Sequence, residues 1–233
     1  MVYEFEPIGI IHSPFKEKFG IPRQPGLVPE VRAELLLSAP YNQPQAVAGL
    51  DGYSHIWIQF LFHRVEKEAW QPMVRPPRLG GNRRVGVFAS RSPFRPNPIG
   101  LSVVRLDRVR ARDGEVVLEI AGADLLEGTP VLDIKPYLPY VDSVPDARSG
   151  FAPEAPPALL EVRFTEQALA QLGERPESEA LGSLICRLLG LDPRPAYSGR
   201  AQPERTYGMR LYDFDLRWRV DEKGVEVLEL APL

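Results

Sequence analysis

Short stretches of alternating or continuous apolar residues recur along the first 140 positions, each bounded by Pro, Gly or Asp. Alternation with a period of two is typical of strands that bury one face. Many short strands at close spacing favour an antiparallel sheet closed into a barrel. The expected strands span residues 3–11, 31–37, 55–62, 85–89, 99–106, 115–121 and 130–134, and one short helix is expected at 43–49.

The pattern changes near residue 144. Residues 143–157 hold four prolines together with Asp, Ser and Gly, a composition typical of a connection between domains. Beyond it we expect a strand at 159–164, a helix opened by Thr165, a second helix ending near Leu189, and strands at 208–220 and 225–230. The sequence therefore predicts a mainly β protein, with an antiparallel β-barrel domain at 1–144 and a small α+β domain at 145–233.

Composition narrows the class of protein further. The 25 prolines among 233 residues disfavour long helices over much of the chain. No apolar stretch reaches the roughly 20 residues that cross a bilayer, and Glu4 and Glu6 replace the basic start of a signal peptide, so we expect a cytoplasmic protein without membrane contact. The lone cysteine, Cys186, lies among Leu and Ile at helical spacing, which predicts a buried structural thiol.

Positive charge is concentrated in one segment of an acidic chain. The net charge is -3, yet the segment from Arg64 to Arg95 carries +6, which leaves -9 for the rest. A local basic patch suits a polyanion bound in one orientation, because phosphate contacts position such a ligand. A solvated charged loop is the alternative. The basic residues are Arg64, Lys67, Arg75, Arg78, Arg83, Arg84, Arg91 and Arg95.

Familiar nucleotide and metal motifs do not occur in the sequence. There is no G-x-G-x-x-G after a strand and no P-loop, so a nucleotide-like cofactor would need another cradle. His12, His55 and His63 lack metal-binding spacing, and one cysteine cannot build a thiolate site, so we expect no metal. We interpret His55, which precedes Ile and Trp, as a strand histidine rather than a general base.

Two proline-rich segments combine stiffness with polar side chains. In residues 91–98 three prolines force the residues before them into extended conformations, which can fix two guanidinium groups for a carboxylate or phosphate. Residues 21–27 place another guanidinium and an amide beside a Pro-Gly turn. Either both loops face one pocket, or they are rigid connections with arginines in solvent.

Residues 133–143 bring together groups that can transfer protons. The run contains two carboxylates, an ammonium and two phenols within eleven residues. A surface ion pair between Asp133 and Lys135 on one strand is the alternative reading.

Taken together, these segments resemble the TrmO family, formerly called TsaA-like proteins. The resemblance covers nearly the whole chain, and RSPFRPNPIG at 91–100 is its most specific part. The other matching segments are IGIIHSPFK at 8–16, PRQPGL at 22–27, YSHIWI at 53–58, RPPRLGGN at 75–82, GTPVLDIKPY at 128–137, DPRPAY at 192–197 and DFDLRW at 213–218.

The resemblance implies a β-barrel methyltransferase that uses S-adenosyl-L-methionine and acts as a homodimer. Its members methylate N6 of threonylcarbamoyladenosine in tRNA, next to the anticodon. By match of segments, the cofactor-binding residues implied here are Arg23, Gln24, Pro25, Gly26, Leu27, His63, Arg64, Arg91, Leu101, Ala121, Gly122, Ala123 and Asp124.

The acceptor nitrogen implied by the resemblance is a poor nucleophile while protonated, because its lone pair is delocalised. We therefore expect a base or proton relay among Asp133, Tyr137 and Tyr140, oriented by Lys135. Stacking and phosphate contacts are the usual means of binding an RNA loop. The candidate tRNA-binding residues are Arg75, Arg78, Arg83, Arg84, Arg95, Arg194, Tyr197 and Arg200, with Arg205 as a further one.

Two functions of other kinds compete with this hypothesis. A non-catalytic RNA-binding module would keep the barrel without needing residues 22–27 and 91–98 intact. A methyltransferase for a small metabolite would not need the basic patch or the second domain.

Overall fold

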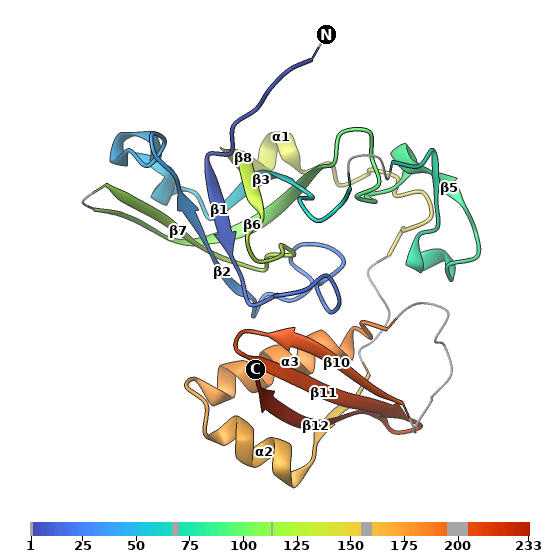
Figure 1. Ribbon diagram of the computed structural model, residues 1–233. Coiled ribbons are helices and arrows are strands. Elements are labelled where there is room, and N and C mark those ends of the chain that lie inside the picture. Colours follow the sequence, from blue (N-terminus) through green and yellow to red (C-terminus); the bar gives the residue numbers. More distant parts are fainter. Residues whose placement is uncertain (1, 67–69, 113, 155–159, 195–204) are drawn as a thin grey trace.

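The computed structural model describes residues 2–66, 70–112, 114–154, 160–194 and 205–233 (Figure 1). Six antiparallel strands form a closed barrel in the order β1-β2-β7-β6-β3-β8, and β8 pairs with β1 to close it. This confirms the predicted barrel. Its strands are β1 (Gly9–His12), β2 (Arg32–Leu37), β3 (His55–Leu61), β6 (Ile99–Arg112), β7 (Glu115–Ala121) and β8 (Pro130–Pro136).

The barrel closes because its strands alternate between apolar and polar residues. Along β3, Ile56, Ile58 and Phe60 are buried while the residues between them remain partly exposed. Burial of each such apolar side chain contributes about 1.5–3 kcal/mol to folding. The inward-facing residues join one core with Ile11, Leu35, Val104, Leu118, Ile120 and Val131.

Four expected elements of the barrel domain differ from the prediction, and one of them, β6, continues to Arg112 instead of ending at 106. The first strand begins at Gly9 rather than at residue 3, and the expected helix at 43–49 is a short 3₁₀ turn, Pro44–Val47, that starts at a proline. The expected strand at 85–89 is the two-residue β5 (Val85–Gly86), paired with β4 (Met73–Val74), and then a 3₁₀ turn. The one α-helix described in this domain is α1 (Pro139–Asp142).

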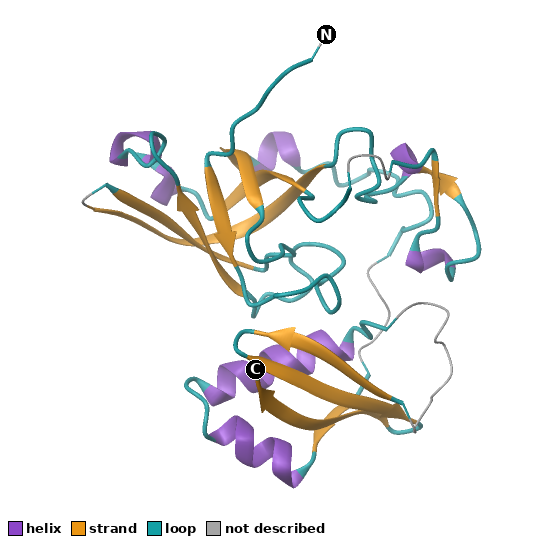
Figure 2. Cartoon of the chain, viewed as in Figure 1, coloured by secondary structure: helices purple, strands orange, loops and turns teal. Residues whose placement is uncertain are grey.

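The C-terminal region is an α+β unit, as predicted. Its mixed sheet has the order β10-β11-β12-β9, with β9 parallel to β12, and two helices pack against it (Figure 2). Its elements are β9 (Val162–Phe164), α2 (Glu166–Gly173), α3 (Ser178–Gly190), β10 (Thr206–Leu211), β11 (Phe214–Asp221) and β12 (Gly224–Pro232).

The single strand expected at 208–220 is wrong. Tyr212 adopts a left-handed φ of 53° and turns the chain, so that β10 and β11 form a hairpin. Tyrosine rarely takes this conformation, and no Gly or Asn marks the turn in the sequence.

Cys186 lies on α3 and is half-buried, whereas the sequence predicted a buried thiol. This partial burial raises the pKa of the thiol.

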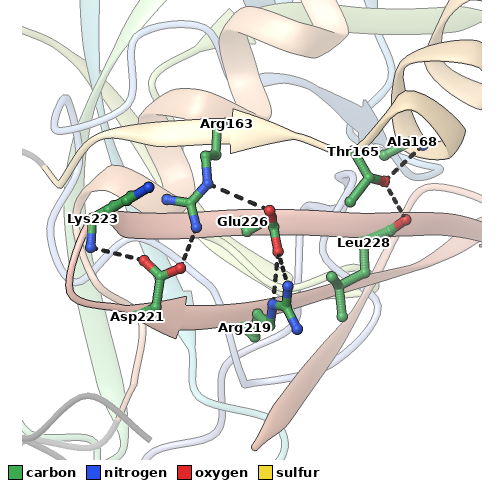
Figure 3. Close-up of polar contacts among 8 residues, drawn as sticks. All are labelled: Arg163, Thr165, Ala168, Arg219, Asp221, Lys223, Glu226 and Leu228. Atoms are coloured by element: carbon green, nitrogen blue, oxygen red, sulfur yellow. Dashed lines mark hydrogen bonds and ion pairs between the residues drawn. The ribbon is translucent and has the colours of Figure 1, made fainter. Parts of the chain in front are cut away.

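Polar contacts at β9 lock the start of α2 onto the sheet (Figure 3). The Thr165 hydroxyl accepts a hydrogen bond from the Ala168 amide at 3.2 Å, which caps α2, and donates to the Leu228 carbonyl at 2.9 Å. Arg163 pairs with Asp221 and, at 3.4 Å, with Glu226. A cap of this kind contributes about 1 kcal/mol to helix stability. The observed cap confirms that the helix begins after Thr165, as predicted.

None of the helices in the described part of the chain is long and apolar enough to cross a membrane.

Candidate cofactor and active site

Two of the segments expected to bind the cofactor meet at one end of the barrel. The Gly26 amide donates a hydrogen bond to the Gly122 carbonyl at 2.8 Å, which joins the β1–β2 loop to the turn after β7. Gly122 has a φ of +72°, and a Cβ there would lie 3.4 Å from the Cα of Gly26. The left-handed φ therefore favours glycine at position 122, whereas a Cβ there would be in ordinary van der Waals contact with Gly26. Ala121 and Ala123 are buried beside it, so this turn offers mainly backbone atoms.

A third segment joins this site through a side-chain bond. Arg91, from the proline-rich loop before β6, donates from Nη1 to Oε1 of Gln24 at 2.6 Å. This confirms that the two rigid loops lie together. Arg23, one residue earlier, is exposed and donates to the Arg194 carbonyl at 3.1 Å.

A partly buried carboxylate lies at the same place. The Ser102 hydroxyl, on β6, donates to Oδ1 of Asp124 at 2.6 Å. Burial raises the pKa of Asp124 to about 6, while the Ser102 hydrogen bond and the charge of Arg91 oppose the rise. The sequence did not single out Ser102. Its inward position on an alternating strand is the only signal that could have identified it.

The remaining expected cofactor residues border this cluster. Lys18, in the β1–β2 loop, donates to the Arg64 carbonyl and so links residues 63–64 to that loop. Burial and the charge of Arg64 lower the pKa of His63, which favours its neutral form at neutral pH. Leu101 is an exposed apolar side chain on β6, with 51% of its surface accessible.

This combination of groups suits a small zwitterionic ligand with a flat ring. The guanidinium of Arg91 can bind a carboxylate, and Asp124 can bind an ammonium or hydroxyl groups. Leu101 offers an apolar surface for a ring, and neutral His63 can accept or donate a hydrogen bond. Among the described residues, no three His, Cys, Asp or Glu side chains gather as metal ligands would.

Asp133 and Lys135, two of the expected proton-transfer residues, lie on the outer wall of the barrel beside the cluster. Asp133 on β8 is opposite Gln59 of β3, and Gln59 is opposite Leu101 of β6. With neighbouring strands about 4.8 Å apart, the backbone of Asp133 is about 10 Å from that of Leu101. Lys135 donates to Oδ2 of Asp133 at 2.7 Å, so the ion pair read from the sequence is present.

An aromatic group continues along the same wall. The ring of Tyr137 is 5.9 Å from that of Trp57 and 6.3 Å from that of His55. All three side chains are partly exposed, and so are available to a planar ligand. Tyr140, on α1, is 84% exposed and stands apart from this group. Sequence reasoning missed Gln59 and Trp57, whose outward position in the alternation of β3 is a detectable signal.

The basic segment divides into free and engaged arginines. Arg75, Arg83 and Arg84 are exposed and have no hydrogen-bond partner among the residues that the structure describes. Arg78 donates to the Glu154 carbonyl, so it is already bound to the chain. Arg95 donates to the carbonyls of Ser90 at 2.8 Å and Val87 at 3.2 Å, and so holds its own loop.

The expected tRNA-binding residues of the second domain lie differently. Arg194 is only 7% exposed, and it binds Asp192 through two hydrogen bonds of 2.7 and 2.8 Å. This burial favours a structural role over contact with phosphate. Arg205 lies over the Tyr207 ring, 4.9 Å from its centroid. Tyr197 and Arg200 lie outside the described residues.

The fold is a closed antiparallel barrel whose loops at one end bring Gln24, Arg91 and Asp124 together, an arrangement suited to an enzyme that binds a small zwitterionic cofactor. Family models match both parts of the chain: the tRNA-methyltransferase O N-terminal domain over residues 10–143, and the TrmO C-terminal domain over residues 157–233. The chain therefore belongs to the TrmO family, as the sequence indicated.

Similar proteins span the full length of the chain. A tRNA (adenine(37)-N6)-methyltransferase of Escherichia coli is 51% identical, covering 99% of this chain and 98% of its own. A Pseudomonas aeruginosa protein named for S-adenosylmethionine-dependent methyl transfer, RcsF, is 48% identical over 99% of both. The crystal structure of TrmO from Pseudomonas aeruginosa aligns with a TM-score of 0.81 at 42% identity and covers 99% of each chain.

Proposed function

We propose that this protein transfers a methyl group from S-adenosyl-L-methionine to N6 of adenine 37 in tRNA, and that the acceptor is threonylcarbamoyladenosine. The names of the full-length relatives support the reaction. The observation that carries the proposal is the junction of the three loops, in which Gly26 binds Gly122 and Arg91 binds Gln24. That junction presents the charges that a methionine-derived zwitterion needs.

The residues of this site fit the cofactor. Arg91 and Arg23 would hold the carboxylate of its amino-acid part, Asp124 would accept hydrogen bonds from its hydroxyl or ammonium groups, and Leu101 would offer an apolar surface to its adenine ring. When bound, S-adenosyl-L-methionine supplies an electrophilic methyl group. The glycines at 26 and 122 let the backbone approach it closely.

Methyl acceptance needs a proton acceptor at the target nitrogen. Asp133 can take this role, because Lys135 holds its Oδ2 at 2.7 Å while its Oδ1 has no hydrogen-bond partner among the residues that the structure describes. The ammonium group orients the carboxylate along the wall that carries Gln59 and Leu101. Tyr137 lies on the same wall, with its ring 5.9 Å from that of Trp57, and is our candidate for contact with a base or for a proton relay. Alignment of nitrogen, methyl and sulfur supplies most of the remaining acceleration.

The exposed arginines of the basic segment are our candidates for contacts with tRNA phosphates. Within the described part of the chain, the guanidinium groups of Arg75, Arg83 and Arg84 have no partner, whereas Arg78 and Arg95 donate to backbone carbonyls. Stacking of an anticodon-loop base on Trp57 or Tyr137 would complete the interface. A homodimer and a cytoplasmic location belong to the same proposal; the homodimer rests on the family resemblance, and the location on the lack of a signal-peptide or membrane-spanning pattern in the sequence.

Methyl-transfer assays test the reaction and the acceptor together. Labelled methyl from S-adenosyl-L-methionine is expected in tRNA from cells that make threonylcarbamoyladenosine and not in tRNA from cells that lack it. Label in both would move the acceptor to an unmodified adenine. Label in neither, with cofactor bound, would favour a small-metabolite acceptor, and loss of cofactor binding as well would favour a binding module without catalysis.

The variant Asp133→Asn tests the proton acceptor. Turnover should fall by roughly 100-fold or more, because general-base catalysis contributes typically 10²–10⁴-fold, while cofactor affinity stays unchanged. Asp51→Asn is the matched control, since Asp51 is an exposed carboxylate in a turn before β3. Equal losses in turnover and in cofactor affinity would reject Asp133 as the base.

A further inference from the structure

The β1–β2 loop, residues 13–31, leaves the barrel and lies against the C-terminal sheet (Figure 1). The Tyr212 amide donates to the Pro14 carbonyl at 2.8 Å, and the Arg210 amide donates to Oε1 of Glu17 at 3.0 Å. Phe15 is buried and forms a β-bridge with Leu211. The first half of this loop is therefore bound to the second domain by backbone hydrogen bonds as well as by packing.

Apolar packing extends this contact along the loop. Phe19 stacks on the fully buried Trp218, with ring centroids 5.8 Å apart and planes 7° apart. At Gly20, which has a φ of +87°, a Cβ would lie 2.1 Å from Sδ of Met209. A larger residue is strained there, because the left-handed φ favours glycine and a Cβ would displace the Met209 side chain.

The second half of the loop contains the expected cofactor residues, and the C-terminal domain holds it too. The Arg23 guanidinium donates to the Arg194 carbonyl at 3.1 Å. Arg187, on α3, donates from Nε to the Leu27 carbonyl at 3.4 Å. Residues 23–27 are thus held at both ends by α3 and the turn that follows it, and in the middle by the bond from Gly26 to Gly122.

The turn that receives Arg23 is itself fixed. Asp192 has a left-handed φ of 51°, and its carboxylate binds the buried Arg194 guanidinium through two hydrogen bonds and the Arg194 amide through a third. The carbonyl of Arg194 therefore has a set direction, because its own side chain cannot move away. An acceptor fixed in this way can orient Arg23 before a ligand binds.

We propose that the C-terminal domain is a positioning part of the cofactor pocket: Arg187 and the Asp192–Arg194 turn hold residues 23–27 in the conformation that binds S-adenosyl-L-methionine. The inference rests on the proposed function. A loop that adopts its binding conformation in only a fraction of molecules binds its ligand more weakly by that fraction. Release of either contact therefore weakens cofactor binding without touching a residue that faces the cofactor.

The test compares two full-length variants by isothermal titration with S-adenosyl-L-methionine and by gel shift with tRNA. Arg187→Ala removes the donor to Leu27, and Asp192→Ala frees the Arg194 turn. Each should raise the cofactor Kd about three- to tenfold, if the loop is then competent in roughly a third to a tenth of molecules. Arg217→Ala and Asp215→Ala are the matched controls, since this ion pair also belongs to the C-terminal domain and lies on β11 with Arg217 exposed.

Two further measurements distinguish a loss of loop positioning from a general loss of folding stability. Thermal unfolding shows whether Asp192→Ala still folds, and Arg187→Lys, which keeps a cationic donor, should recover most of the affinity. A raised cofactor Kd with unchanged tRNA affinity supports the proposal. Lower tRNA affinity with an unchanged cofactor Kd, or no change in either, overturns it. If the wild-type protein binds no cofactor, the proposed function falls as well, whereas normal wild-type binding with unaffected variants refutes this inference alone.

Discussion

Asp124→Asn is the substitution whose effects on stability and on function should have opposite signs. The side chain is partly buried, and its pKa is raised from 3.8 to about 6. Because the protonated form is favoured in the folded protein, folding binds a proton between these two pH values. This group therefore contributes its full stability below about pH 4, and that contribution is lost as the pH rises through 6.

The size of this loss follows from the pKa shift. A shift of about two units corresponds to roughly 3 kcal/mol, since each unit is 1.36 kcal/mol. Asparagine keeps an oxygen that can accept from Ser102 and carries no charge at any pH. The unfolding free energies of wild type and Asp124→Asn should therefore be nearly equal at pH 4 and diverge by up to about 3 kcal/mol by pH 7, with the variant more stable.

Urea denaturation of the cofactor-free proteins at both pH values measures this difference. Asp51→Asn removes a charge from an exposed position and serves as the control. The same Asp124 variant should bind S-adenosyl-L-methionine more weakly by roughly 10- to 100-fold at pH 7, because a hydrogen bond to a charged group contributes about 1.5–3 kcal/mol. Parallel pH profiles for wild type and variant would refute the reasoning about burial, and unchanged affinity would remove Asp124 from the pocket.

Three more predictions concern separate parts of the molecule. Thr165→Ala should lower the unfolding free energy by about 1–2 kcal/mol in urea denaturation, because α2 loses its cap and β12 loses a hydrogen bond, while Thr165→Ser should be nearly neutral. Gly20→Ala should destabilise the protein by about 1–2 kcal/mol through its left-handed φ alone, measured by thermal unfolding against Gly52→Ala, where a Cβ meets nothing. Reversal of charge at Arg83 and Arg84 should weaken tRNA binding in gel shifts and reduce its salt dependence, and undiminished affinity would place the phosphate contacts elsewhere.

The alternation of apolar residues was sufficient to predict the barrel. β7 was predicted at its observed bounds, and β2 and β3 within one residue, because each buries one face continuously. The prediction failed where tertiary contacts override local preference. The β10–β11 turn is one such case, since Tyr212 takes a left-handed φ that nothing in its sequence announces. The boundary at residue 144 stays a prediction.

The sequence could nominate residues for the candidate site but could not give their arrangement, and their roles stay a prediction. The stiffness of the proline-rich loops and the family resemblance selected Gln24 and Arg91 from the sequence, but their bond of 2.6 Å joins positions 67 residues apart. The burial of Arg194 was not predictable, because an arginine in a proline-rich segment reads as exposed. Ser102 and Gln59 were missed because polar residues on strands are common, and only the register shows which of them meet.

The bond from Arg23 to the Arg194 carbonyl joins positions 171 residues apart, and this separation sets an order of events during synthesis. At about 5–20 residues per second, translation reaches the second partner on the order of ten seconds or more after the first. A nascent barrel can close its six strands in that interval while residues 23–27 still lack half of their contacts. On the inference drawn above, the binding loop is complete only after the α3 turn has been made, and partly synthesised chains should bind the cofactor more weakly than the finished protein.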